Sequence, residues 1–370
     1  MKVVLMTGAN GFLGRNLGLR LKQRPEISLV CIDKGDSAKV LRRGLDTADV
    51  IFHFAGVNRP KDVGEFEIEN YKFTKDMLEY LIKIGRTPLI IFSSSTQSAQ
   101  NSPYGMSKKR AEEELLGFKK ATGATVIIFR LTNVFGKWAK PFYNSVVATF
   151  CYQATHGEKL RIEDPSKIIE FVYIDDVIEA FLGLLDGKTN SGEEFISLRQ
   201  SYCCTLEELA AAIRGFGEFR NGANLPDLRT PFLKYLYSTY LSYLDASDLA
   251  YSMKKNEDTR GYLFEFMKSN LSGQVFVSRT VPGVTRGNHY HHTKVEKFCV
   301  IEGKARISLR HMLTDERIDF DVEGRECKVL VIPPGYTHSI ANTGDIDLLT
   351  LFWANEPFDS TRPDTYPSQV

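Results

Sequence analysis

Two groups of residues in this sequence have the types and the spacing to do chemistry. In the first group, Tyr104 and Lys108 lie four residues apart, so that on a helix both side chains share one face. A lysine ammonium in that place lowers the pKa of the phenol, which could then exchange a proton with a sugar or alcohol oxygen. Ser95 ends an apolar run upstream of Tyr104, and its hydroxyl could polarise the same carbonyl. This group predicts proton transfer coupled to hydride transfer.

The second group consists of metal-ligand side chains in the C-terminal part. His289 and His291 alternate along a β run, which places both on one face, and Glu296 begins the next run. His338 ends a Pro-Pro-Gly-Tyr-Thr-His segment further on. Three imidazoles and one carboxylate suit Zn, Mn, Fe or Ni better than Mg or Ca. We therefore expect a divalent metal site, with a merely structural or metal-free site as the alternative. Tyr336 could face the same pocket as a proton donor.

A glycine turn supplies the expected cofactor site. Gly8, Gly11 and Gly14 follow the first apolar run and open a helical pattern, where a backbone turn and a helix N-terminus accept a pyrophosphate. Asp33 ends the second β run, where a carboxylate can bind ribose hydroxyls, while Lys34 beside it could instead meet a 2′-phosphate. These residues leave NAD(H) and NADP(H) both open.

The elements that must position these groups fall into two patterns. Short apolar runs alternate with helical segments over the first 185 or so residues, which predicts βαβ units and a doubly wound parallel sheet of Rossmann type. Beyond Arg260 the β runs follow one another closely, which predicts an all-β barrel or sandwich. A tyrosine-rich segment between them looks like a packed connector. We place the boundary near residue 245, giving domains 1–245 and 246–370.

Composition excludes several classes of protein. The chain has 370 residues with 47 basic and 46 acidic side chains, so its net charge of +1 gives no bulk attraction to nucleic acid or anionic lipid. Apolar runs stay shorter than a membrane span, and the N-terminus lacks the pattern of a signal peptide. Six scattered cysteines without a CxxC pair fit reduced thiols. We expect a cytoplasmic protein with a small ligand and no membrane insertion.

The order of these N-terminal motifs resembles the extended short-chain dehydrogenase/reductase family from Met1 to about residue 245. The segments ADVIFHFAG, FRLTNVFG and FVYIDDV look like further signatures of that family. The resemblance implies that Ser95, Tyr104 and Lys108 are catalytic and that Asn133 contacts substrate. Members that dehydrate their substrate carry an acidic residue after the serine, whereas Thr96 follows here, so we expect reduction or epimerisation at carbon 4. The implied cofactor-binding residues are Gly8, Asn10, Gly11, Phe12, Leu13, Gly14, Asp33, Lys34, Ala55, Gly56, Tyr104 and Lys108.

Other polar residues of this half have plainer alternatives. Lys137, Trp138 and Lys140 could clamp a nucleotide diphosphate, or they could belong to a solvated loop. We expect Asp175 and Asp176 to lie at a helix N-terminus as capping carboxylates. His53 is expected to be a packed strand histidine.

The two C-terminal metal-ligand segments resemble the paired motifs of the cupin superfamily, a jelly-roll barrel. Gly283 and Gly303 occupy the motif's glycine positions, and His292 is expected to face outward. One departure is that the glycine which usually opens the second motif is Cys327 here, which puts a turn in doubt rather than a ligand.

Over its whole length the chain resembles bifunctional capsular-polysaccharide enzymes that join an extended reductase to a metal-binding cupin. The segments AGVNRP, PYGMSK, NVFGKW, YSTYLSYL, RGNHYHHTKVEKF and PGYTH match in order. The resemblance implies carbon 3 epimerisation of UDP-2-acetamido-2,6-dideoxy-hex-4-ulose by the cupin. NADPH-dependent reduction at carbon 4 would follow, giving a UDP-6-deoxy-N-acetyl-L-talosamine on the route to UDP-N-acetyl-L-fucosamine. It also implies zinc and a homodimer.

Two other functions stay open at this point. The chain could be a single-function nucleotide-sugar 4-reductase or 4-epimerase whose cupin only dimerises or binds ligand. It could also be a sugar-nucleotide binding or regulatory protein, although the complete set of Ser95, Tyr104 and Lys108 argues against that function.

Overall fold

The computed structural model describes residues 1–187, 194–198, 200–219 and 222–370, and it divides the chain into two compact units. The N-terminal unit comprises 1–214 and 229–244, and the C-terminal unit comprises 215–228 and 245–370. The short segment 215–228 belongs to the C-terminal unit because its backbone pairs there. The amide of Leu225 donates to the carbonyl of Lys268 at 2.8 Å, and the amide of Lys268 donates to Ala223 at 2.6 Å.

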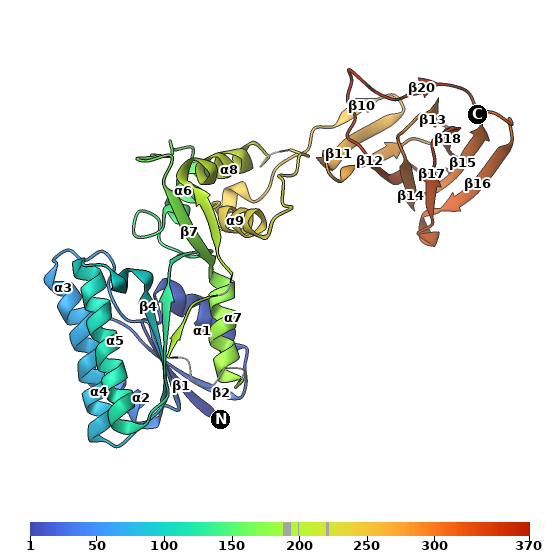
Figure 1. Cartoon of the computed structure of the whole chain (residues 1–370). Helices are drawn as coiled ribbons and strands as arrows, with labels where there is room; N and C mark the ends of the chain where they lie inside the picture. The colour runs from blue at the N-terminus through green and yellow to red at the C-terminus, as the bar shows by residue number, and fades with distance from the viewer. Residues whose placement is uncertain (188–193, 199, 220–221) are drawn as a thin grey trace. The chain divides into compact units, whose positions relative to one another are not determined.

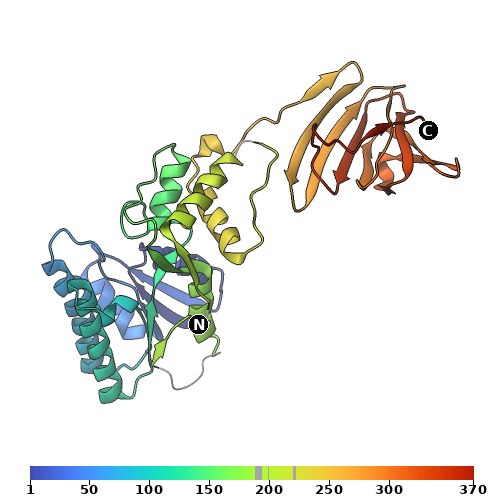
Figure 2. The same cartoon turned by 45° about the horizontal axis from the view of Figure 1, so that its top comes forward.

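A six-stranded parallel sheet forms the centre of the N-terminal unit, in the order β2-β1-β3-β4-β5-β8. Helices cover both faces (Figures 1 and 2). Alternate residues of β1 serve opposite faces, since Val4 and Met6 pack with α1 and α7, whereas Leu5 packs with α2, α4 and α5. This arrangement confirms the predicted doubly wound sheet. The strands are β1 (Lys2–Thr7), β2 (Ile27–Ile32), β3 (Val50–His53), β4 (Leu89–Ser95), β5 (Val126–Leu131) and β8 (Phe195–Ile196), and the helices are α1 (Phe12–Lys22), α2 (Ala38–Thr47), α4 (Phe73–Lys83), α5 (Pro103–Thr122) and α7 (Ile174–Leu185).

The chain reverses its direction of winding between β1 and β3, because β2 lies outside β1 while β3 to β5 continue on the other side. In such sheets ligands bind outside the carboxyl ends of the strands at the reversal point. The carboxyl ends of β1, β2, β3 and β4 therefore meet at one edge: Gly8, Asp33 and Gly56 follow the first three strands, and Ser95 ends β4.

A smaller three-stranded sheet in the order β6-β7-β9 extends this unit. The apolar segment TVIIFRLTNVFG forms two strands, of which β5 belongs to the large sheet and β6 to the small one. The tyrosine-rich connector forms α9, in which Leu236 and Tyr240 are buried. The additional elements are β6 (Asn133–Phe135), β7 (Ile168–Tyr173), β9 (Tyr202–Thr205), α6 (Val146–Thr155), α8 (Leu206–Glu218) and α9 (Pro231–Leu241).

The C-terminal unit is all-β, as the sequence predicted, and consists of two antiparallel sheets around one core. Phe298, Ile307, Ile340 and Phe352 are among the buried core residues. The first sheet comprises β10 (Asn256–Asp258), β11 (Gly261–Ser269), β12 (Gly273–Thr280), β19 (Leu348–Ala354), β14 (Glu296–Glu302) and β17 (Val329–Ile332). The second comprises β16 (Arg317–Glu323), β15 (Lys304–His311), β18 (Tyr336–Asn342), β13 (Thr285–Tyr290) and β20 (Tyr366–Pro367).

None of the helices in the described ranges combines the length and the apolarity that a membrane span needs. The six cysteines are all free thiols, as expected.

Candidate active site and candidate metal centre

The glycine turn lies directly between β1 and α1. Gly8 has a φ of +69°, and a Cβ atom there would lie 2.8 Å from the backbone nitrogen of Ala55. A Cβ atom at Gly14 would lie 2.4 Å from the carbonyl oxygen of Gly8. Only glycine fits both places, because the turn packs against the end of β3 and the start of α1. The helix begins after Gly11, whose backbone amide donates to Gly8 at 3.0 Å, so the N-terminus of α1 is available to an anion.

Asp33 is fixed at the end of β2 by backbone amides. Its carboxylate accepts hydrogen bonds from the amide of Asn10 at 2.5 Å and from the amide of Lys34 at 2.8 Å. The ammonium of Lys34 is paired with Glu69 at 2.9 Å. A cavity of about 800 Å³ begins here and is lined by more acidic than basic side chains. The charged side chains are Asp33, Asp36, Glu69, Asp76 and Glu79 against Lys34, Arg42 and Lys83.

The three predicted catalytic residues all line a neighbouring cleft of about 610 Å³. Ser95 is the last residue of β4, and its side chain is near enough to that of Tyr104 to act on the pKa of the phenol. Ser102 caps α5 by accepting from the amide of Gly105 at 3.1 Å, and Pro103 begins the helix, so that Tyr104 lies in the first turn and Lys108 one turn later. Both cavities share Gly8, Gly11 and Gly56, so together they can hold the two halves of a dinucleotide.

Burial has the largest effect on the pKa values of Tyr104 and Lys108. It raises the pKa of Tyr104 to about 12, although the nearby side chain of Ser95 acts in the opposite direction. Burial also lowers the pKa of Lys108 to about 8. The ammonium of Lys108 donates to the carbonyl of Ser93 at 3.0 Å. The expected lowering of the Tyr104 pKa by Lys108 is therefore not seen in the protein alone, because loss of solvent around the phenol outweighs it.

Asn70 supports this site and has no signature in the sequence spacing. It lies in a π-helix (Glu67–Lys72), a distortion that often marks functional sites. Its side-chain oxygen accepts from the amide of Val57 at 2.7 Å, and its side-chain nitrogen donates to Ser107 at 3.0 Å. It thus ties the loop after β3 to α5. His53 is buried with both ring nitrogens bonded, to Thr7 at 2.7 Å and Thr74 at 2.8 Å, which confirms a packed strand histidine.

The substrate side of the cleft agrees only partly with the predicted contacts. Asn133 and Trp138 line it, whereas the ammonium of Lys137 forms an ion pair with Asp175, at 3.0 and 2.9 Å from the two carboxylate oxygens. Asp175 and Asp176 lie in the first turn of α7, where acidic side chains were expected, but they do not cap it: Tyr173 is the N-cap and makes no side-chain cap bond, and Asp175 pairs with Lys137.

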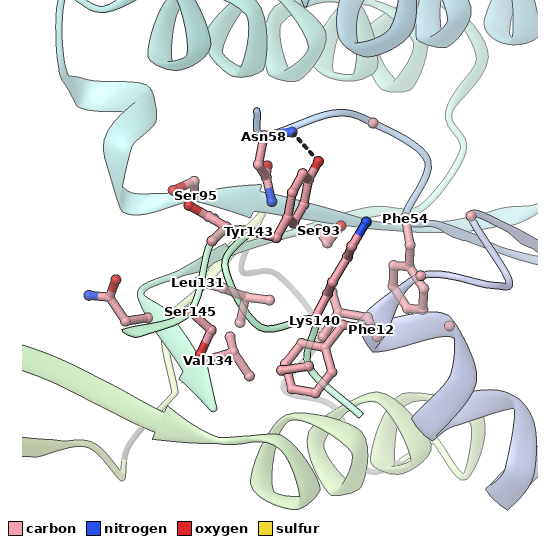
Figure 3. Close-up of a pocket in the computed structure, with 18 of the residues that line it drawn as sticks. Phe12, Phe54, Asn58, Ser93, Ser95, Leu131, Val134, Lys140, Tyr143 and Ser145 are labelled. Carbon is pink, nitrogen blue, oxygen red and sulfur yellow. Dashed lines mark hydrogen bonds between the residues drawn. The ribbon is translucent and has the colours of Figure 1, made fainter. Parts of the chain in front are cut away.

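Lys140 and Tyr143 line the cleft instead of Lys137. In Figure 3 the hydroxyl of Tyr143 points toward Asn58, and the side chain of Lys140 extends on the Phe54 side of Tyr143. The hydroxyl of Tyr143 accepts a hydrogen bond from the amide of Asn58 at 3.4 Å. The sequence placed Lys140 beside Lys137 without a means to choose between them, and it gave no signal for Tyr143.

The four predicted metal ligands come together in the C-terminal unit. One ligand atom of each of His289, His291, Glu296 and His338 lies within 4.8 Å of the others. A carboxylate oxygen of Glu296 is 3.3 Å from Nε2 of His291 and 3.1 Å from Nε2 of His338. These three atoms are buried and have no hydrogen-bond partner within the described part of the chain. Imidazole nitrogens and a carboxylate oxygen that converge without hydrogen-bond partners are suited to bind a divalent cation.

The charges around this cluster suit a metal. Burial and the neighbouring imidazoles lower the pKa of His289 to about 4. Burial acts to raise the pKa of Glu296, but the close imidazoles of His291 and His338 outweigh it and lower the pKa to about 2. An ionised carboxylate and a neutral imidazole are the protonation states that metal ligands need.

Three further residues of this unit, Tyr336, Cys327 and His292, were singled out in the sequence. Tyr336 alternates with His338 along β18 and packs against the core. Cys327 has a φ of +49°, so the turn that its motif normally builds with glycine is kept in a left-handed conformation. His292 is exposed, as expected.

Comparison with known proteins matches both units. Residues 4–196 match the model of the NAD dependent epimerase/dehydratase family, and residues 256–366 match a polysaccharide biosynthesis C-terminal domain. UDP-2-acetamido-2,6-beta-L-arabino-hexul-4-ose reductase from Pseudomonas aeruginosa is 40% identical over 99% of this chain and 98% of its own length.

Solved structures agree with the sequence relatives. The capsular polysaccharide assembling protein CapF from Staphylococcus aureus superposes with a TM-score of 0.93 at 40% identity over 100% of both chains. A UDP-glucuronic acid 4-epimerase from Bacillus cereus in complex with NAD has a TM-score of 0.57 at 18% identity over 66% of this chain and 99% of its own, a likeness of fold alone.

Proposed function

This chain belongs to the NAD-dependent epimerase/dehydratase family, and on that premise we propose that it is a bifunctional nucleotide-sugar enzyme of capsule or O-antigen synthesis. Its substrate is UDP-2-acetamido-2,6-dideoxy-hex-4-ulose. The C-terminal unit epimerises carbon 3, and the N-terminal unit then reduces carbon 4 to give UDP-6-deoxy-N-acetyl-L-talosamine, toward UDP-N-acetyl-L-fucosamine. The observation that carries the proposal is that Ser95, Tyr104 and Lys108 line one cleft together with the glycine turn.

In the reductase the nicotinamide supplies the hydride, and the side chains supply the proton and the geometry. Tyr104, with its pKa raised to about 12, is protonated at neutral pH and can donate its proton to the carbon 4 oxygen. Ser95 donates a hydrogen bond to the same oxygen and orients it. Lys108 donates to the carbonyl of Ser93 on β4 and lies beside Gly56 in the loop after β3, where its ammonium would bind the ribose hydroxyls and stabilise the phenolate left after proton transfer.

On the substrate side we propose that Asn133 and Trp138 contact the nucleotide sugar, as the resemblance implied. Lys140 is better placed than Lys137 for the diphosphate, because it lines the cleft while Lys137 is paired with Asp175. A contact from Lys137 would require that ion pair to open.

In the C-terminal unit His289, His291, Glu296 and His338 would hold a divalent metal, probed most simply as zinc. The ion would supply positive charge to a sugar carbonyl, which makes the neighbouring C–H acidic. Tyr336 is the proposed proton donor on this side. A metal held only for stability is the alternative, and it would leave a single-function reductase.

The nicotinamide cofactor has two candidate forms. The resemblance implies NADP(H), whereas the surroundings of Asp33 favour NAD(H). The Asp33 carboxylate is immobilised by two amides, and the nearest cation, Lys34, is already neutralised by Glu69. A 2′-phosphate at this place would meet excess negative charge.

The two active sites can be tested separately with matched variants. Tyr104→Phe should lower NADH or NADPH oxidation by roughly 10²–10⁴-fold, the usual contribution of a general acid, while proton exchange at carbon 3 continues. Tyr71→Phe is the control, since it removes a tyrosine hydroxyl of the same unit that bonds Glu114. His289→Ala should abolish exchange at carbon 3 and weaken metal binding. Substantial reductase turnover in Tyr104→Phe would overturn the catalytic assignment.

A further inference from the structure

The C-terminal tail, residues 363–370, contacts the segments that carry all three histidine ligands. Strand β20 pairs with His289 and Tyr290 of β13 (Figure 1). The carbonyl of Ser368 accepts a hydrogen bond from Thr337, the residue before His338, at 2.7 Å. Asp364 contacts His291 and the three residues that follow it. The tail is therefore built around the candidate metal centre rather than laid on a remote surface.

The main chain of Asp364 sets the orientation of one ligand. Its carbonyl oxygen accepts a hydrogen bond from Nδ1 of His291 at 2.5 Å. Because a carbonyl can only accept, this bond places a proton on Nδ1, so that in the neutral ring the lone pair is on Nε2. Nε2 is the nitrogen that lies 3.3 Å from Glu296, at the point where the ligands converge. Hydrogen bonds of this kind fix the tautomer and the ring plane of metal-binding histidines.

The side chain of Asp364 fixes the loop between two ligands. Its Oδ1 accepts from the amide of His292 at 3.0 Å, and its Oδ2 accepts from the amides of Thr293 and Lys294 at 2.9 Å each and from the Thr293 hydroxyl at 3.0 Å. The buried ammonium of Lys294 returns a bond to the carbonyl of Pro363 at 2.9 Å. One carboxylate thus holds the turn between His291 and Glu296.

Asp364 also adopts a backbone conformation that L-residues rarely take. Its φ is +38°, a strained conformation that persists only where surrounding contacts enforce it. Here those contacts are the hydrogen bonds to the loop between His291 and Glu296. Asp359, four residues before the tail begins, makes a comparable but purely local cap, accepting from the amide and hydroxyl of Thr361 at 2.8 and 2.7 Å.

We propose that Asp364 is a positioning residue for the metal centre: it orients His291 and holds the His291–Glu296 loop ready for the ion. The inference rests on the metal site of the proposed function and adds the element that organises it. Removing the carboxylate should release the loop and the carbonyl that fixes the His291 ring, so that ion binding must order both.

The test compares zinc binding by full-length Asp364→Ala, Asp359→Ala and the unchanged protein, using competition with a chromogenic chelator. Changes to residues that support metal ligands cost about 10–100-fold in affinity, and we expect a loss of that size for Asp364→Ala alone. Asp364→Asn keeps one acceptor oxygen and tolerates the left-handed backbone, so its loss should be intermediate. Cobalt substitution adds a spectroscopic readout, since a displaced His291 changes the visible absorption of the bound ion.

The outcomes separate the two proposals. Zinc binding by Asp364→Ala and Asp364→Asn as tight as that of the unchanged protein would overturn the positioning role and leave the metal site intact. Equal losses in Asp364→Ala and Asp359→Ala would also overturn it, because they would show a general effect of this part of the chain. If the unchanged protein binds zinc no better than His338→Ala, the metal site itself is wrong.

Discussion

Lys108 is a cationic side chain in surroundings that disfavour its charge. It is buried, and its pKa falls from 10.5 to about 8. Since the folded-state value lies below the unfolded one, the folded protein binds fewer protons between about pH 8 and 10.5, and this group's contribution to stability rises with pH through that window. Below pH 8 the full penalty of burying the charge is present. The fold tolerates that penalty where the reaction needs a cation.

Lys108→Met should therefore stabilise the protein while removing reductase activity. At pH 7 we expect the free energy of unfolding to rise by about 1–3 kcal/mol. This is the free energy that corresponds to the shift of the Lys108 pKa, minus that of the lost hydrogen bond to Ser93. Urea denaturation at pH 7 and again near pH 10.5 measures it, and the gain should shrink at the higher pH. A variant less stable than the unchanged protein at pH 7 would contradict this account of Lys108.

Asp33 makes a second prediction at this scale, about cofactor choice. We expect a higher kcat/KM with NADH than with NADPH. Asp33→Ser should lower the NADH to NADPH ratio by about tenfold, since removing one like charge beside a phosphate is worth on the order of 1 kcal/mol. Asp46→Ser on the neighbouring helix α2 is the control. A preference for NADPH in the unchanged protein would show that Lys34 leaves Glu69 to bind the 2′-phosphate.

Among the elements, the β1–turn–α1 unit carries the closest backbone packing in the cofactor site. Gly8 and Gly85 have nearly the same φ, +69° and +68°, but Gly8 faces the backbone of Ala55 while a Cβ atom at Gly85 would meet no described heavy atom within 4 Å. Alanine substitution at both positions therefore separates the cost of a left-handed backbone conformation from the cost of a steric clash.

Gly8→Ala should lower cofactor affinity and stability, whereas Gly85→Ala should lower stability alone. The left-handed backbone costs both variants about 1–2 kcal/mol, and the clash adds roughly 1–3 kcal/mol to Gly8→Ala only. Chemical denaturation and titration with the reduced cofactor measure the two effects. Equal losses for the pair would mean that Gly8 is required for its φ and not for close approach.

Local patterns in the sequence predict these elements well. The turn after β1, the helix that carries Tyr104 and Lys108, and the strand alternation of the metal ligands all follow from short-range rules, and the structure has them. Features that depend on tertiary contacts were beyond those rules. The break between β5 and β6, the partner of Lys137 and the support from Asn70 each depend on a segment distant in the chain.

On the scale of the whole molecule, the two proposed activities lie in two units with separate cores. A ligand that binds only the folded form stabilises the unit that holds it. If the two units unfold in separate transitions, the cofactor should therefore raise the unfolding temperature of the N-terminal unit and the metal that of the C-terminal unit.

Removal of metal by chelation should lower the unfolding temperature of the C-terminal unit and leave the shift caused by NADH or NADPH in the N-terminal unit unchanged. Calorimetry with and without each ligand measures both. His338→Ala is the control, because chelation should have no further effect on it. A chelator that abolished the cofactor-induced shift would contradict the assignment of the two ligands to separate units.

The most direct test of the central claim is incubation in deuterated water with the UDP-4-keto-6-deoxy-N-acetylhexosamine, following deuterium at carbon 3 by NMR and cofactor oxidation by absorbance. We predict exchange at carbon 3 without cofactor and reduction once NADH or NADPH is added. Reduction with no deuterium at carbon 3 would contradict the bifunctional account and leave a single-function reductase with an accessory β unit.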